Sequence, residues 1–174
     1  MAVNGEARAL GRLGDRRGVD EAVERAYAGV SRLPPREGMS PCLSFGRYSE
    51  ARVAANAATA YLSLGATSRV LDYAARIESP VEKSHVDWDR SLVRLDVATA
   101  LVRQQVPDVD HAADVALAAL QASAGKPIEP VRQRAGEFVA EACRWQTRPA
   151  MREFTEALHG WNATTLPASG PEVR

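Results

Sequence analysis

Hydrophobic and polar positions follow a helical period along most of the chain, and no segment alternates strictly enough to predict a strand. The clearest example is SEARVAANAATAYLSLG, residues 49–65. Apolar side chains recur three or four positions apart along it, at Val53, Ala57, Tyr61 and Leu64. Ser49 is suited to an N-cap, and Gly65 to a left-handed residue after the last turn. We therefore predict a helix that runs from Ser49 to Leu64.

Proline, glycine and capping residues divide the rest of the chain into further segments. The predicted helices span residues 2–13, 19–33, 49–64, 68–77, 84–105, 109–122, 128–145 and 149 to 158 or 161. A loop rich in Pro, Gly and Ser is inserted at 34–48. The tail 162–174 has no apolar period, and we expect it to be mobile. One domain, residues 1–161, is therefore predicted.

Short sequences recur between these segments. Ala58-Thr59-Ala60 returns 40 positions later, and Leu13-Gly14 returns 51 positions later as Leu64-Gly65. Pairs of helices that resemble each other at periods of roughly 34 to 50 residues are typical of an α-solenoid. Alanine and glycine are expected where neighbouring helices approach closely. The predicted fold is all-α, a right-handed α-solenoid of about three to four helix pairs with a C-terminal capping helix.

Several segments resemble known repeat and regulator families. ALGRLGD (9–15) and AYLSLG (60–65) are similar to the end of the first helix of a tetratricopeptide repeat. FGRYSEARVAANAATAYLSLG, DWDRSLVRLDVATALV, PIEPVRQRAGEFVAEACRW and PAMREFTEALHGW resemble the C-terminal region of actinobacterial transcription regulators. In that family a Cro/repressor-type helix-turn-helix precedes a tetratricopeptide-like sensor domain, and the resemblance covers about residues 5–161. It implies a regulatory domain that binds a peptide or partner protein, with a homodimer as a further expectation. Because these residues include no helix-turn-helix, we expect no direct binding to DNA.

A polar row follows from the repeats. In a helix-pair solenoid, the first helix of each pair lines the concave face, so its polar stripe is the candidate ligand surface. The stripe on residues 50–64, and the positions 40 residues after it and 51 before it, give Arg8, Arg12, Arg52, Asn56, Thr59, Ser63, Asp96, Thr99 and Arg103. Guanidinium and amide groups suit a peptide backbone or a terminal carboxylate. An ordinary solvated helix face is the alternative interpretation.

Asp96 stands out in this row because it lies between Leu95 and Val97. An acid beside apolar neighbours either finds a cationic partner or points into water. We expect Arg52 or Arg103 as its partner, or solvent.

Composition narrows the possible functions. The 22 basic and 22 acidic side chains cancel, which does not favour binding of nucleic acid by charge. Cys42 and Cys143 lack the spacing of a zinc site or disulfide framework, so two unpaired thiols are expected. No apolar run approaches the ~20 residues of a membrane span. We expect a cytoplasmic protein with no membrane attachment and no cofactor.

Catalytic and metal motifs are weak. Residues 85–89, HVDWD, carry metal-binding residue types, but their i, i+2, i+4 spacing does not place three ligands on one helical face. Neither a nucleophile elbow nor a phosphate-binding loop is present. The tryptophans are expected to anchor or cap the core: Trp88, Trp145 and Trp161. The prediction is therefore a non-enzymatic, ligand-sensing or peptide-binding regulatory domain; the alternative is a stand-alone structural adaptor or oligomerisation module with no small ligand.

Overall fold

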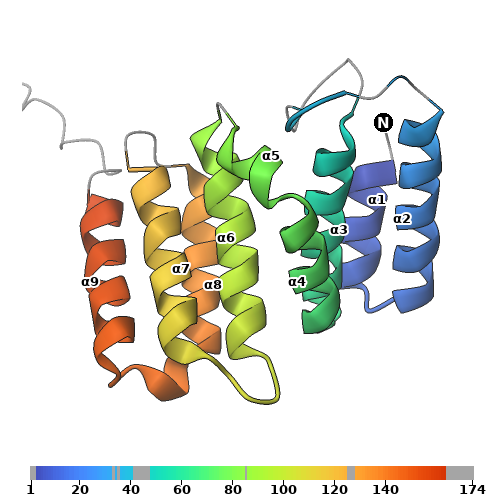
Figure 1. The fold of residues 1–174 in the computed structure, drawn as a ribbon. Coiled ribbons are helices and arrows are strands. Elements are labelled where there is room, and N and C mark those ends of the chain that lie inside the picture. The colour runs from blue at the N-terminus through green and yellow to red at the C-terminus, as the bar shows by residue number, and fades with distance from the viewer. Residues whose placement is uncertain are drawn as a thin grey trace, which may run out of the picture.

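In the computed structural model, all regular structure in the described residues is helical (Figure 1), which confirms the all-α prediction. The described residues are 3–32, 34, 36–40, 48–84, 86–124 and 128–163. The α-helices are α1 (Val3–Arg12), α2 (Arg16–Ser31), α3 (Glu50–Ser63), α4 (Thr67–Arg76), α5 (Glu78–Glu82), α6 (Asp87–Val102), α7 (Val109–Ala122), α8 (Glu129–Glu141) and α9 (Pro149–Ala163), with a 3₁₀ turn at Cys143–Trp145. The predictions for Cys42, His85 and most of the tail concern residues outside these ranges.

Capping chemistry explains why the helices begin and end near the predicted residues. Ser49 Oγ accepts a hydrogen bond from the Arg52 amide at 3.2 Å, and Asp108 Oδ1 accepts one from the His111 amide at 3.2 Å. Both are N-cap contacts that satisfy an amide with no acceptor inside the helix. Gly65 follows α3 with φ +67°, a backbone conformation that glycine adopts at little cost.

The short helix α5 was not predicted, because Pro80 was expected to end the preceding segment. Pro80 is instead the third residue of α5. The first amides of a helix have no intrahelical acceptor, so proline is tolerated there.

The helices pack in a regular order. α1 and α2, α3 and α4, and α6 and α7 lie side by side as consecutive pairs (Figure 1). α1, α3, α6 and α8 contact one another in succession and form one row. α2 packs on α1 and α3, α4 on α3 and α6, and α7 on α6 and α9. Four helices that are not consecutive in sequence therefore share a face.

The apolar side chains form two adjoining cores. One is built mainly from α1 to α5 and includes Tyr61 and Tyr73, whose rings stack with centroids 5.6 Å apart. The other is built from α6 to α9 around Phe138 and Phe154, which meet edge to face at 5.1 Å. The partly buried Leu71 packs against both cores. All three tryptophans pack in the second core, as predicted.

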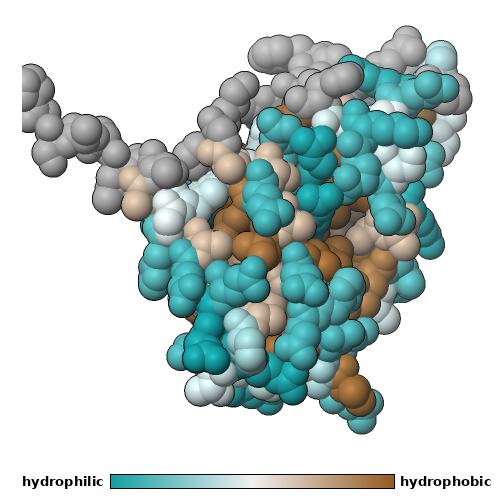
Figure 2. All heavy atoms as spheres, turned by 60° about the vertical axis from the view of Figure 1, so that its left-hand side comes forward, coloured by the Kyte–Doolittle hydropathy of each residue, from teal (hydrophilic) through white to brown (hydrophobic). Residues whose placement is uncertain are grey.

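The surface of the helices is mostly hydrophilic. Figure 2 shows apolar side chains gathered in hollows between hydrophilic ones on one face of the molecule. Among the described residues, the exposed large apolar side chains are Leu13 and Val106, and both lie in turns between paired helices. The apolar faces of the helices are therefore largely used in packing.

Small side chains allow α1 and α3 to approach closely. A Cβ atom at Gly11 would lie 2.6 Å from the carbonyl oxygen of Ala60. Ala57 and Ala60 in α3 are themselves buried. The many alanines of α3 thus replace bulky core residues because the neighbouring backbone occupies that space.

We predict that Gly11→Ala destabilises the protein by about 1–3 kcal/mol, as overpacking does. At an exposed helix position, a glycine-to-alanine change stabilises the protein by up to about 1 kcal/mol. Gly136→Ala in α8 is the matched control, since a Cβ there meets nothing within 4 Å. Urea unfolding of both variants measures the difference. Equal stability of the two variants would show that α1 does not approach α3 in this way.

Candidate functional site

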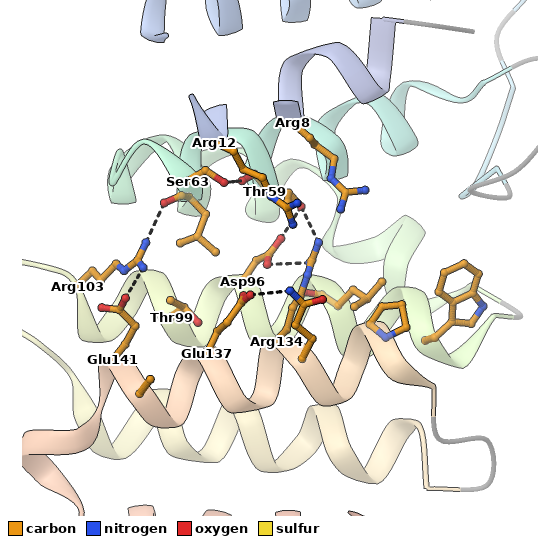
Figure 3. Close-up of a pocket in the computed structure, with 16 residues that line it drawn as sticks. Arg8, Arg12, Thr59, Ser63, Asp96, Thr99, Arg103, Arg134, Glu137 and Glu141 are labelled. Atoms are coloured by element: carbon orange, nitrogen blue, oxygen red, sulfur yellow. Dashed lines mark hydrogen bonds and ion pairs between the residues drawn. The ribbon is translucent and has the colours of Figure 1, made fainter. Parts of the chain in front are cut away.

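A polar cavity of about 370 Å³ opens on the row formed by α1, α3, α6 and α8 (Figure 3). This volume lies in the range of small-ligand sites. Its lining residues come from all four helices: Arg8 and Arg12 from α1; Thr59, Leu62 and Ser63 from α3; Trp88, Leu92, Asp96 and Thr99 from α6, with Arg103 directly after it; Pro130, Gln133, Arg134, Glu137, Ala140 and Glu141 from α8. Four arginines and three acids therefore face one space.

Most of the polar row predicted from the repeats lines this cavity. The residues that do so are Arg8, Arg12, Thr59, Ser63, Asp96, Thr99 and Arg103. Arg52 and Asn56 do not line it. The repeats therefore identified three walls of the cavity and missed the fourth, α8.

Asp96 lies at the floor of the cavity, where its carboxylate is buried. Oδ2 accepts a hydrogen bond from Thr59 Oγ1 at 2.7 Å, and Oδ1 accepts one from Arg134 Nη1 at 2.7 Å. Arg134 also donates to the Leu92 carbonyl at 3.1 Å. The expected partners, Arg52, Arg103 or solvent, were wrong, because α8 places Arg134 nearer to this carboxylate.

Burial raises the pKa of Asp96 above its ordinary value, since the charged form loses its hydration. The charge of Arg134, the hydrogen bond from Thr59 and the charge of Arg8 oppose this effect, while the charge of Glu137 adds to it. The folded protein therefore holds this proton more tightly than the unfolded chain does. It follows that the contribution of Asp96 to stability falls as the pH rises from the unfolded pKa toward the folded one.

A second ion pair lies at one end of the cavity. Arg103 pairs with Glu141 and donates to the carbonyl of Leu62 at 2.9 Å, so it connects α6 with α8 and α3. The hydrogen bond from Arg103 lowers the pKa of Glu141. Both side chains are about one third exposed, so solvent weakens this pair.

Arg52 has a structural position away from the cavity. Its Nη2 donates to both carboxylate oxygens of Asp89 at 2.7 Å, and its Nε donates to the Ser40 carbonyl at 2.7 Å. Arg52 and Asp89 are both buried. The guanidinium thus holds α3, α6 and the segment before α3 together, and it is not placed to meet a ligand in the cavity.

The register between the helices explains why the pairing of Arg52 and the residues of α8 were not predicted. Shifting by 40 residues aligned Asn56 with Asp96, but the contacting pairs are 37 or 38 residues apart. They are Arg52 with Asp89, Thr59 with Asp96, Asp96 with Arg134, and Arg103 with Glu141. An offset of 37 or 38 joins Arg52 and Arg103 each to an acid on the next helix of the row, and it joins Arg134 to an acid on the preceding one. That charge pattern is the signal that could have identified α8.

A second cleft, of about 400 Å³, lies between α4, α5, α6 and α7. Its walls are mainly apolar, and the acid Glu82 on its rim is already paired with Arg94 at 2.7 Å. It offers fewer convergent polar groups than the cavity around Asp96.

The chain matches no protein-family model, no curated protein and no solved structure. No helix in the described ranges is long and apolar enough to cross a membrane. Within those ranges, histidine, cysteine and acidic side chains form no cluster of three that could hold a metal ion. Cys143 is exposed and not bonded to another cysteine.

We predict that Asp89→Ala costs about 3–5 kcal/mol of stability, because it leaves the Arg52 guanidinium buried without its counter-ion. Glu141→Ala, which removes the partly exposed partner of Arg103, is expected to cost about 1 kcal/mol or less. Chemical unfolding of the two variants beside the parent protein measures both values. If Asp89→Ala cost no more than Glu141→Ala, Arg52 would not be held by this pair and would become a candidate ligand residue again.

Proposed function

We propose that this protein is a ligand-sensing regulatory domain that binds a peptide or a partner protein in the polar cavity between α1, α3, α6 and α8. One observation carries the proposal: side chains from four helices, distant in sequence, bring guanidinium, carboxylate and hydroxyl groups into one space. A few convergent polar groups in a concavity are the usual means by which a protein orients a ligand.

Two features support a tetratricopeptide-like repeat, a right-handed solenoid of three to four helix pairs capped by α9. The first helices of successive pairs contact one another in a row. The polar pairs from α3 to α6 and from α6 to α8 keep an offset of 37 or 38 residues. A constant offset is expected when similar helix pairs stack in the same way.

The resemblance to actinobacterial regulators supports a role in transcription control in the cytoplasm. In this proposal the described residues sense a ligand or partner within a homodimer, and DNA is contacted by another part of the regulator. The net charge of zero gives no electrostatic basis for DNA binding by these residues themselves.

A structural adaptor without a small ligand is a second candidate, and internal pairing favours it. Asp96 with Arg134 and Arg103 with Glu141 already satisfy part of the polar lining. In an adaptor, these charges would serve only to hold the row of helices together.

A substitution that fills the cavity distinguishes a ligand-binding domain from a structural adaptor. Ala140 lines the cavity and is exposed, so Ala140→Phe occupies the space without removing a charge. Ala28→Phe, on the exposed face of α2, is the matched control. A soluble library of random short peptides with both ends free is first selected on the parent protein, and the selected peptides are then measured on both variants.

We expect Ala140→Phe to weaken the selected peptides at least about tenfold, equivalent to 1.4 kcal/mol, while Ala28→Phe leaves affinity unchanged. Failure to select any peptide, or equal affinity in both variants, would contradict binding in the cavity and favour the adaptor.

A further inference from the structure

The two long walls of the cavity differ in charge. Arg8 and Arg12 extend from α1 toward α6 and α8, whereas Glu137 extends from α8 on the opposite side (Figure 3). Arg8 and Glu137 both line the cavity, and their charges act on the pKa of Asp96 in opposite directions. A positive wall therefore faces a negative one.

The charges between these walls are neutralised within the protein. Asp96 is paired with Arg134, and Glu141 is paired with Arg103. A ligand would have to break a buried or charge-assisted contact to recruit any of these four groups. They are therefore better suited to shape the cavity than to bind an ion.

Arg12 and Glu137 remain available. Glu137 accepts a hydrogen bond from the neutral amide of Gln133 at 3.1 Å. Among the described residues, neither Arg12 nor Glu137 forms an ion pair, and the two do not bridge each other within 4.0 Å. Both are exposed to the cavity solvent. Opposite charges thus face each other across a space large enough for a small molecule.

We propose that the cavity recognises a zwitterion: its carboxylate binds at Arg12 and its ammonium group binds at Glu137. This inference rests on the proposed function and names its ligand class. A short peptide with both ends free and a free amino acid share this chemistry. An anion alone would leave Glu137 as a like charge nearby, and a cation alone would face Arg12, so a dipolar ligand fits both walls at once.

Blocking the ends of a peptide tests each contact separately. The probes are tripeptides Gly-Xaa-Gly with uncharged Xaa, prepared with free ends, with an acetylated amine, or with an amidated carboxyl group, and glycine is included as the free amino acid. Saturation-transfer NMR detects weak binding of each probe to the full chain. We expect each blocked end to weaken binding about tenfold, the order expected when a charge-assisted contact is lost.

Two variants assign each end to a wall. Glu137→Gln should bind the free and acetylated tripeptides equally, and Arg12→Gln should bind the free and amidated ones equally. Arg16→Gln, an exposed arginine of α2, should retain the full discrimination of the parent. Thermal unfolding checks that all three variants fold. Comparing glycine with the free tripeptides separates the amino acid from the peptide as the source of the zwitterion.

Equal binding of free and blocked tripeptides to the parent, or no binding of any free probe, would overturn the zwitterion. The peptides selected from the library decide the proposed function independently. If those peptides bind the parent and lose affinity in Ala140→Phe, the binding cavity stands although its ligand is not a zwitterion.

Discussion

A carboxylate buried between helices needs partners on each helix that excludes water from it, and Asp96 meets this requirement with one oxygen for α3 and one for α8. Arg134 then ties α8 back to the backbone of α6 through the Leu92 carbonyl. The relative positions of these three helices depend on this arrangement. The cavity above Asp96 exists because the same arrangement keeps polar side chains on the shared face.

Close packing on the other side of α3 makes this geometry possible. Gly11 lets α1 approach the backbone of α3 at Ala60, which brings Arg8 and Arg12 over the cavity. The buried Arg52–Asp89 pair joins α3 and α6 near the residues where both helices begin. The close approach of α1 to α3 and the two ion pairs, Arg52–Asp89 and Asp96–Arg134, therefore position the cavity. The residues proposed to contact the ligand, Arg12 and Glu137, belong to neither ion pair.

Helix boundaries could be predicted because caps such as Ser49 and Asp108 act through neighbouring amides. Seven residues of the cavity were also predictable, since a periodic pattern places them on one helical face. The register between helices was not predictable, because it depends on which side chains fit across the interface. Arg52 was assigned to the ligand because it lies on the polar stripe of residues 50–64, and an offset of 40 instead of 37 concealed its pairing with Asp89. Arg134 and Glu137 went unnoticed because the offset was not extended to α8. The acids that follow Arg52 and Arg103 at an offset of 37 or 38 residues indicate this register in the sequence.

The geometry of this cavity depends most on the burial of Asp96, and titration of the Asp96 carboxyl group tests that burial. Carbon-13 NMR of the side-chain carboxyl, assigned by comparison with Asp96→Asn, follows its protonation in the folded protein. We expect a pKa above the ordinary value near 3.9 for aspartate, because burial outweighs the attraction of Arg134. A pKa at or below that value would show that hydration or the charge of Arg134 outweighs burial, and it would contradict burial as the dominant influence on Asp96.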